Sequence, residues 1–392
     1  MEMKKLLQDA MKRSIDNGEV MGVNILVEKA GEEIVYCEEG LADRENNRPI
    51  CRDTIFRLYS QTKPVTAACA MILMERGLLD LGAPVAEYLP AYAKLKVADP
   101  DGIREAHTQM RVHDLLGMTS GLVYPDEGNE AEKATKKLYE ELDRRLHTEN
   151  PMTTREFADR LAECPLAYEP GSGWQYGTSA DVLGAVIEAA SGKKLSEFMQ
   201  DEIFGPLGMK DTAFWVPEEK RQRLAKVYET VCDENGKKGM RIYTGDNLAV
   251  RNDMAVPPAY EAGGAGLVST LDDYMKFARM LRQNGSFENK KILNPGTVRY
   301  MCGAQLMPEQ QQFDHKISLE GHSYGNLMRI CKDPGRALML AREGEYGWDG
   351  WLGAYFANFP KEDMTILMGT QKKDAGTFSL TRKIRNIILS EI

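Results

Sequence analysis

The chain has 392 residues, of which 43% are hydrophobic and 28% are charged, a balance typical of a globular protein with a substantial core. Its formal net charge of −9 argues against the basic surface that nucleic acids and anionic membranes require. No apolar run approaches the length of a membrane span, so we expect neither nucleic-acid nor membrane partners.

The N-terminal segment, residues 1–20, predicts a folded amphipathic helix. Its apolar residues recur at helical spacing. Charged residues interrupt them, so the continuous apolar region of a signal peptide is missing. We therefore expect a cytoplasmic protein.

The cysteines and histidines predict neither a disulfide framework nor a metal site. The seven cysteines are scattered, odd in number and never spaced C-x-x-C, which favours reduced thiols. The five histidines show no spacing typical of metal ligands. We expect no metal site and no cofactor.

Two β-hairpins are predicted from alternating apolar and polar residues. The first joins segments 23–28 and 34–38 through Ala30-Gly31-Glu32. The second joins 228–231 and 240–243 through Asp233-Glu234-Asn235-Gly236.

Ser60-Gln61-Thr62-Lys63 is the most informative segment of the chain. Residues three apart share a helix face, so we expect the Lys63 amine within hydrogen-bond reach of the Ser60 hydroxyl. The apolar segment 65–74 that follows is strongly helix-forming, which places Ser60 in the first turn of a buried helix. A serine hydroxyl becomes a good nucleophile when a neighbour takes its proton. We therefore predict that Ser60 and Lys63 are catalytic.

The same S-x-x-K spacing occurs a second time, at Ser191 and Lys194. There the serine follows the apolar run 182–187, and Gly192 comes next, which is typical of a helix C-terminus. Lysines at this position stabilise the negative end of the helix dipole. We therefore reject Ser191 as a nucleophile.

The rest of the chain predicts helices in the middle and strands near the C-terminus. Expected helices cover 64–77, 112–116, 134–146, 154–163, 180–190, 195–204, 271–281 and 377–389. Expected strands cover 324–330, 337–341, 352–358 and 364–370. The charged stretch 126–150 favours a solvated surface helix over a flap above the site.

The order of these elements predicts an α+β fold. A helix and a hairpin begin the chain, and strands and a helix end it, so we expect both termini to build one antiparallel sheet flanked by helices. Residues 1–75 and 260–392 would form this sheet domain. Residues 76–259 would form an inserted, mainly helical domain.

Tyr176 is a candidate third catalytic group, in the turn-rich loop 169–178. If it lies near Lys63, the cation should lower the pKa of its phenol and let it act as a general base. On the residues alone, a tyrosine that simply packs its ring is the preferred alternative.

Two further motifs are interpreted as coincidental. Gly321-His322-Ser323-Tyr324-Gly325 fits the G-x-S-x-G nucleophile elbow, but a strand-like run follows it and no histidine occurs later in the chain. Tyr324 and Asn326 also spell Tyr-x-Asn, inside the same strand-like run. We interpret both Ser323 and Tyr324 as structural.

Several more segments, taken in order, carry a family resemblance. They are Gly77-Leu78-Leu79-Asp80-Leu81, Pro84-Val85, Tyr88-Leu89-Pro90, Val112 with Asp114-Leu115-Leu116, Met118-Thr119-Ser120-Gly121-Leu122, Pro170-Gly171, Pro206-Leu207-Gly208-Met209, and Gly263-Gly264-Ala265-Gly266-Leu267 with Ser269-Thr270. With Ser60 and Lys63, they make nearly the whole chain resemble the serine β-lactamase and penicillin-binding-protein superfamily. The most similar branch is the class C β-lactamase-related one, which includes the family VIII carboxylesterases. The resemblance implies a β-lactamase/transpeptidase-like fold and a serine hydrolase.

The resemblance also implies roles for particular residues. Tyr176 matches the tyrosine of the family's Tyr-x-Asn motif, the proposed general base, and Thr178 replaces its asparagine. Trp348-Asp349-Gly350 matches the Trp-x-Gly form of the third motif, which is Lys-Thr-Gly in other members. The oxyanion hole would be formed by the backbone N–H groups of Ser60 and Trp351.

These departures from the family pattern bear on the substrate. Trp348 cannot supply the cation that helps to bind a carboxylate, and Asp349 would repel an anion if it faced the site. A tryptophan wall suits apolar groups. The residues expected to bind substrate are Thr178, Trp348, Asp349 and Gly350.

We therefore expect a small-molecule neutral or apolar acyl ester, hydrolysed or transferred through a Ser60 acyl-enzyme. One alternative is a D-amino-acid peptidase, an amidase or a weak β-lactamase. Another is a ligand-binding or self-assembling relative without activity. The sequence leaves the oligomeric state open.

Overall fold

The computed structural model describes residues 2–232, 234, 236, 238–307, 310–312 and 319–392. An eight-stranded antiparallel sheet has the order β14-β15-β16-β17-β18-β1-β2-β3. Its strands are β1 (Gly22–Lys29), β2 (Glu32–Asp43), β3 (Arg48–Pro49), β14 (His322–Gly325), β15 (Met328–Cys331), β16 (Tyr346–Asp349), β17 (Tyr355–Phe359) and β18 (Met364–Thr370). β1 pairs with β18, so the two ends of the chain meet inside one sheet, as predicted.

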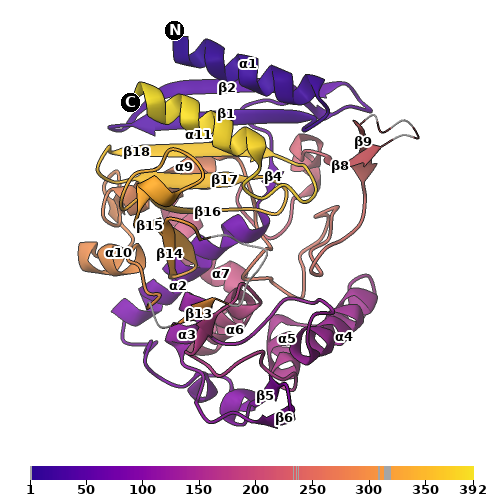
Figure 1. Cartoon of the computed structure of the whole chain (residues 1–392), viewed down its shortest axis with the longest axis vertical. Coiled ribbons are helices and arrows are strands. Elements are labelled where there is room, and N and C mark those ends of the chain that lie inside the picture. The colour runs from indigo at the N-terminus through magenta and orange to yellow at the C-terminus, as the bar shows by residue number, and fades with distance from the viewer. Residues whose placement is uncertain (1, 233, 235, 237, 308–309, 313–318) are drawn as a thin grey trace.

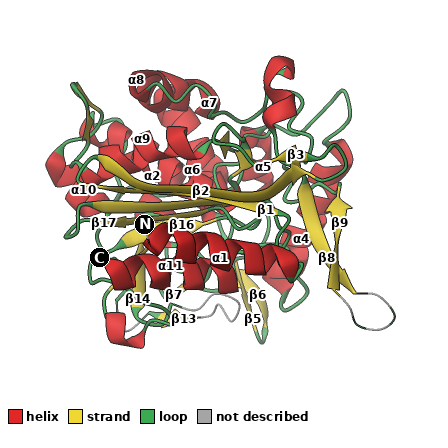
Figure 2. Cartoon of the chain, turned by 90° about the horizontal axis from the view of Figure 1, so that it is seen from above, coloured by secondary structure: helices red, strands yellow, loops and turns green. Residues whose placement is uncertain are grey.

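Helices cover both faces of this sheet. α1 (Glu2–Asp16) and α11 (Ser379–Glu391) lie side by side on one face, and α2 (Lys63–Glu75) and α9 (Leu271–Arg282) lie on the other (Figure 2). α1 and α11 bury Leu7, Met11, Ile384 and Ile388 against the apolar side chains of β1 and β18. Each such side chain contributes on the order of 1.5–3 kcal/mol.

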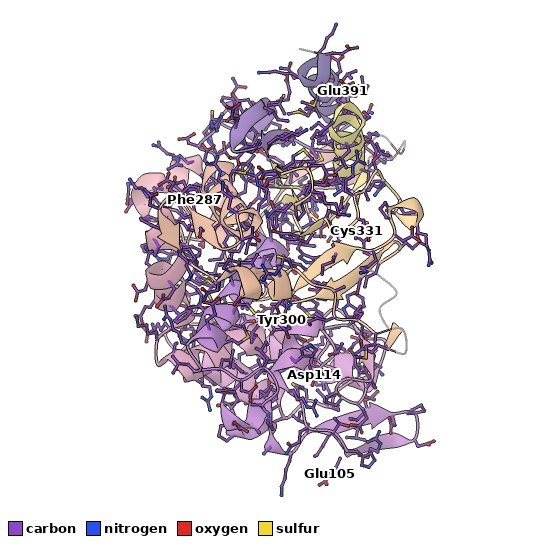
Figure 3. All side chains as sticks on the ribbon, turned by 90° about the vertical axis from the view of Figure 1, so that its left-hand side faces the viewer. Glu105, Asp114, Phe287, Tyr300, Cys331 and Glu391 are labelled. Atoms are coloured by element: carbon purple, nitrogen blue, oxygen red, sulfur yellow. The ribbon has the colours of Figure 1, made fainter. Side chains whose placement is uncertain are left out.

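A mainly helical part lies below the sheet in Figure 1. Its helices are α3 (Val112–Gly117), α4 (Glu130–Arg145), α5 (Thr154–Leu161), α6 (Ser179–Ser191), α7 (Leu195–Met199) and α8 (Gly205–Leu207). α6 is buried along most of its length and packs against α2 and α3. In Figure 3, Glu391 of α11 marks the sheet end of the molecule and Glu105 marks the opposite end. The proposed division at residues 75/76 and 259/260 stays a prediction.

Shorter elements complete the part of the chain that the structure describes. The strands are β4 (Phe56–Arg57), β5 (Lys96–Asp99), β6 (Gly102–Glu105), β7 (Gly173–Trp174), β8 (Val227–Cys232), β9 (Lys238–Tyr243), β10 (Val268–Ser269), β11 (Ser286–Phe287), β12 (Lys290–Lys291) and β13 (Gln311–Gln312). A 3₁₀-helix, η1 (Tyr59–Thr62), leads into α2, a π-helical turn, η4 (Gln200–Phe204), follows α7, and α10 spans Pro295–Met301.

Both predicted hairpins are present. β1 and β2 are joined at Ala30 and Gly31, whose φ values of 53° and 82° match the left-handed turn that a two-residue hairpin favours. β8 pairs with β9 in the second hairpin. Asp233 and Asn235 of its predicted turn lie outside the described residues.

Two of the predicted strands are wrong. Segment 324–330 is not one strand but the hairpin β14–β15, because Asn326 and Leu327 take positive φ values of 46° and 63° and turn the chain back. Segment 337–341 is irregular, and Leu338 remains 70% exposed. α10 is a helix that the periodicity did not predict.

None of the helices in the described ranges is both long and apolar enough to cross a membrane. The cytoplasmic location stays a prediction.

Candidate active site

Ser60 lies at a strained turn between β4 and α2. The preceding residue, Tyr59, has a φ of 45°, which is costly for a bulky side chain and is found where the surrounding structure enforces it. The Tyr59 ring packs edge-on against Trp351 with ring centroids 4.9 Å apart. Ser60 itself is half-buried in η1, where the first backbone N–H groups have no intrahelical acceptor. The turn therefore holds the Ser60 hydroxyl beside the start of α2.

Lys63 lies one turn after Ser60 and is fully buried. Its Nζ contacts the Ser60 hydroxyl at 3.1 Å, the Tyr124 hydroxyl at 3.0 Å and the Gly264 carbonyl at 2.8 Å. Burial lowers the pKa of Lys63 to about 7, although the charge of Asp181 opposes this shift. A large fraction of Lys63 is then a neutral amine at neutral pH. Its lone pair can accept the Ser60 proton while an N–H group is held by the Gly264 carbonyl.

Tyr176 lies over the same amine. Lys63 Nζ is 4.7 Å from the centre of the Tyr176 ring. The Trp348 indole N–H donates a hydrogen bond to the Tyr176 hydroxyl at 2.9 Å. The structure thus brings together the three residues that the sequence predicts as catalytic, together with the tryptophan of the third motif.

The predicted lowering of the Tyr176 pKa is wrong in direction. Burial raises the pKa of Tyr176, against the smaller lowering effects of its hydrogen bonds with Ser60 and Trp348. Lys63 does not reverse the shift, because its own burial favours the uncharged amine. Tyr176 is therefore a neutral phenol at physiological pH, suited to relay a proton rather than to accept one first.

Tyr124 is a site residue that sequence reasoning missed. It lies in the loop after α3, its hydroxyl contacts Lys63 Nζ, and its ring lies 5.6 Å from that of Tyr176. Burial raises its pKa far above that of a free phenol. The available signal was its position two residues after the family-like segment 118–122 and directly before Pro125.

The third motif closes the site from the sheet. Trp348 and Asp349 lie at the end of β16, and β17 follows the motif. A Cβ on Gly350 would lie 2.1 Å from the Leu58 carbonyl oxygen, so a glycine is needed for this close backbone approach. The approach brings Trp351 beside the Ser60 turn, and the Trp351 indole N–H donates to Asp374 Oδ1 at 2.6 Å.

Two of the predicted substrate-binding side chains are engaged with the protein. Asp349 pairs with Arg329 Nη1 at 3.4 Å, which offsets the repulsion of anions expected from its charge. Thr178 is fully buried, and its hydroxyl donates to the Val123 carbonyl at 3.4 Å. Thr178 therefore packs its loop against the loop that carries Tyr124.

A pocket of about 630 Å³ adjoins the third motif. Trp348, Trp351 and Asp349 line one side of it, and Leu338 and Met339 from the irregular segment line another. Segment 337–341, which was predicted to be a strand, therefore leaves the apolar side chain of Leu338 exposed at this pocket. The pocket is mixed in character, because charged or polar side chains complete its wall beside the apolar ones: Glu320, His322, Arg329, Asp374, Thr377 and Arg382.

The serines and the tyrosine that we interpreted as coincidental motif matches lie outside the group of side chains around Lys63. Ser191 ends α6, and Gly192 follows with a φ of 70°, as expected for a helix C-terminus. Ser323 lies in β14 and is followed by β15 rather than by a helix. Tyr324 is fully buried and packs its ring 5.1 Å from that of Trp348. In the described part of the chain, no cluster of metal-binding side chains occurs.

The contact between Trp348 and Tyr176 predicts a measurable effect on turnover. Trp348→Phe keeps an aromatic ring but removes the N–H donor that orients the Tyr176 hydroxyl. We expect kcat on an ester substrate to fall about tenfold, with KM little changed, as one lost hydrogen bond allows. Steady-state kinetics beside a thermal melt would check this. A normal kcat in a stably folded variant would show that the hydrogen bond does not act in catalysis.

The chain is similar to known proteins over most of its length. The Beta-lactamase family model matches residues 3–388. Esterase EstB of Burkholderia gladioli is 32% identical, over 85% of this chain and 81% of EstB. Monacolin J acid methylbutanoyltransferase of Aspergillus terreus is 27% identical, over 82% of this chain and 76% of that protein. The solved structure of EstCE1, a hydrolase with promiscuous acyltransferase activity, superposes with a TM-score of 0.78, 25% identity and 98% coverage of both chains.

Proposed function

The chain belongs to the beta-lactamase family, and from that premise we propose that it is a serine carboxylesterase or acyltransferase that works through a Ser60 acyl-enzyme. The observation that carries the proposal is the contact of 3.1 Å between the Ser60 hydroxyl and the buried Lys63 amine. Relatives named as an esterase and as an acyltransferase support the same reaction class.

In the acylation step, the Ser60 oxygen attacks the carbonyl carbon of the ester. Its proton passes to the neutral amine of Lys63, and negative charge develops on the former carbonyl oxygen. The backbone N–H groups of Ser60 and Trp351 stabilise that charge. The ester C–O bond then breaks, and the proton reaches the leaving alkoxide from Lys63 through the Tyr176 hydroxyl.

Deacylation runs the same steps in reverse with a new nucleophile. Water or an alcohol gives its proton to the Tyr176 and Lys63 pair and attacks the acyl carbonyl. The Ser60–acyl bond breaks, and Ser60 recovers its proton. Water yields an acid and an alcohol yields a new ester, so hydrolysis and acyl transfer share one ping-pong route.

The substrate class follows from what surrounds Ser60. Trp348 stands where many relatives of this fold carry a cation, and the charge of Asp349 is offset by Arg329. The adjoining pocket combines the apolar side chains of Trp351, Leu338 and Met339 with charged ones, which include Arg329 and Arg382. The indole rings of Trp348 and Trp351 beside the catalytic groups fit a small acyl ester without charge near the scissile bond.

A substrate panel tests this proposal. We expect kcat/KM for p-nitrophenyl butyrate to exceed that for a chromogenic cephalosporin or a D-amino-acid amide by about 100-fold or more. Added alcohols should divert the acyl group to new esters that mass spectrometry can identify. Efficient cephalosporin or amide turnover with negligible ester hydrolysis would contradict the proposed substrate class.

A further inference from the structure

A buried carboxylate lies behind Lys63. Asp181 belongs to the first turn of α6 and is only 2% exposed. Its Oδ1 accepts a hydrogen bond from the Gly264 backbone N–H at 3.0 Å. Burying a carboxylate is costly unless hydrogen bonds and an opposite charge compensate. The mechanism described above assigns it no part.

Gly264 joins this carboxylate to the amine. Its N–H donates to Asp181, and its carbonyl accepts from Lys63 Nζ at 2.8 Å. A Cβ on Gly264 would lie 3.0 Å from Asp181 Oδ2 and 3.2 Å from Lys63 Nζ. Both groups therefore flank the same α-carbon, at a separation where buried opposite charges interact strongly. A larger residue at this position would push them apart.

Among the residues that the structure describes, the other titratable groups that face the pair are phenols. They are Tyr124 and Tyr176 beside Lys63, and Tyr139 of α4 and Tyr260 of the loop before Gly263 beside Asp181. Burial raises the pKa of each, so all four are neutral at physiological pH. Asp181 is the group whose charge opposes the effect of burial on Lys63.

We propose that Asp181 is a positioning residue that supplies the counter-charge for the Lys63 ammonium and fixes the Gly264 carbonyl that orients it. The inference rests on the proposed function, in which Lys63 takes the Ser60 proton. That transfer creates a buried ammonium while negative charge moves through the Ser60 oxygen to the substrate. A carboxylate already in place stabilises the ammonium until it returns the proton to the leaving group.

Asp181→Asn removes the negative charge of the side chain but keeps its hydrogen bond, because the amide oxygen can still accept from the Gly264 N–H group. Without the carboxylate the ammonium is less stable, so Lys63 loses its proton at a lower pH. The acid limb of the rate profile, where activity rises as Lys63 deprotonates, should move to lower pH by about one unit or more. The plateau rate should fall about tenfold, because the ammonium formed during acylation loses its counter-charge.

The measurement is the rate of Ser60 labelling by an alkyl fluorophosphonate as a function of pH, followed by mass spectrometry. This reagent reacts with an activated serine whether or not the natural ester is known. Failure of the esterase proposal is therefore distinguishable from failure of this one. If wild type is labelled but does not hydrolyse esters, the proposed substrate class is wrong. The role of Asp181 is then still tested by comparing the pH profiles of labelling of wild type and Asp181→Asn.

Asp114→Asn is the matched control. Asp114 of α3, labelled in Figure 3, is also a buried carboxylate that accepts a backbone N–H, from Arg111 at 2.8 Å. We expect its variant to change stability but to keep the acid limb of wild type. Asp181→Glu, which retains the charge, should keep the limb as well. If Asp181→Asn does not fold, Asp181→Ser provides a small neutral acceptor for the same comparison.

The outcomes are distinct. A limb shifted to lower pH in Asp181→Asn alone would support the proposal. An unshifted limb would overturn it and would mean that Asp181 carries a proton of its own and only packs against Gly264. An equal shift in Asp114→Asn would also overturn it, because the effect would then reflect any loss of buried charge.

Discussion

Ser60→Ala is expected to lower kcat/KM on p-nitrophenyl butyrate by more than about 10⁴-fold, because it removes the atom that receives the acyl group. The variant should fold normally. Ser60 is half-buried, and Lys63 keeps its contacts with Tyr124 and Gly264. The thermal midpoint should therefore change by only a few degrees.

Mass spectrometry of the protein after rapid quenching gives the direct measurement. Wild type should carry one acyl group on Ser60, and Ser60→Ala should carry none. Ser191→Ala serves as the control, because it removes the serine of the other S-x-x-K segment and should behave as wild type. An acyl adduct in Ser60→Ala, or its loss in Ser191→Ala, would overturn the assignment of the nucleophile.

Much of the site was predictable because its geometry is local. Ser60 and Lys63 belong to one helical turn, so their contact follows from helix periodicity alone. Tyr176 required the family resemblance, since its loop reaches Lys63 only through the packing of α6 on α2. Tyr124 was still harder to predict from the sequence, because no periodic pattern distinguishes a catalytic tyrosine in a loop from one that only packs its ring.

The errors also have physical causes. Segment 324–330 alternates like one strand, and nothing in its composition requires Leu327 to adopt a left-handed conformation. Segment 337–341 is apolar and was predicted to be a strand, yet it is irregular, and Leu338 and Met339 line the pocket beside β16. The Tyr176 pKa was predicted from its cation alone, and burial acts on both partners of that pair. Burial is a tertiary property, so sequence spacing gives no measure of it.

Tyr176→Phe is expected to lower kcat by about 100-fold or more, because the proton then has no phenol through which to reach the leaving group. KM should change less, since the ring remains in place. Tyr324→Phe is the matched control. Tyr324 is buried against Trp348, and its hydroxyl has no hydrogen-bond partner among the described residues, so its loss should cost little. The reverse pattern would show that the wrong tyrosine has been assigned.

Trp348 complicates the interpretation of Tyr176→Phe, because removing the phenol leaves the buried indole N–H without its acceptor. That alone costs about 1–3 kcal/mol of stability. A double-mutant cycle with Trp348→Phe separates the two effects, since the double variant contains neither the donor nor the acceptor. If Tyr176 relays the proton, the double variant should recover stability but not kcat. Recovery of kcat as well would mean that Tyr176 acts only by packing against Trp348.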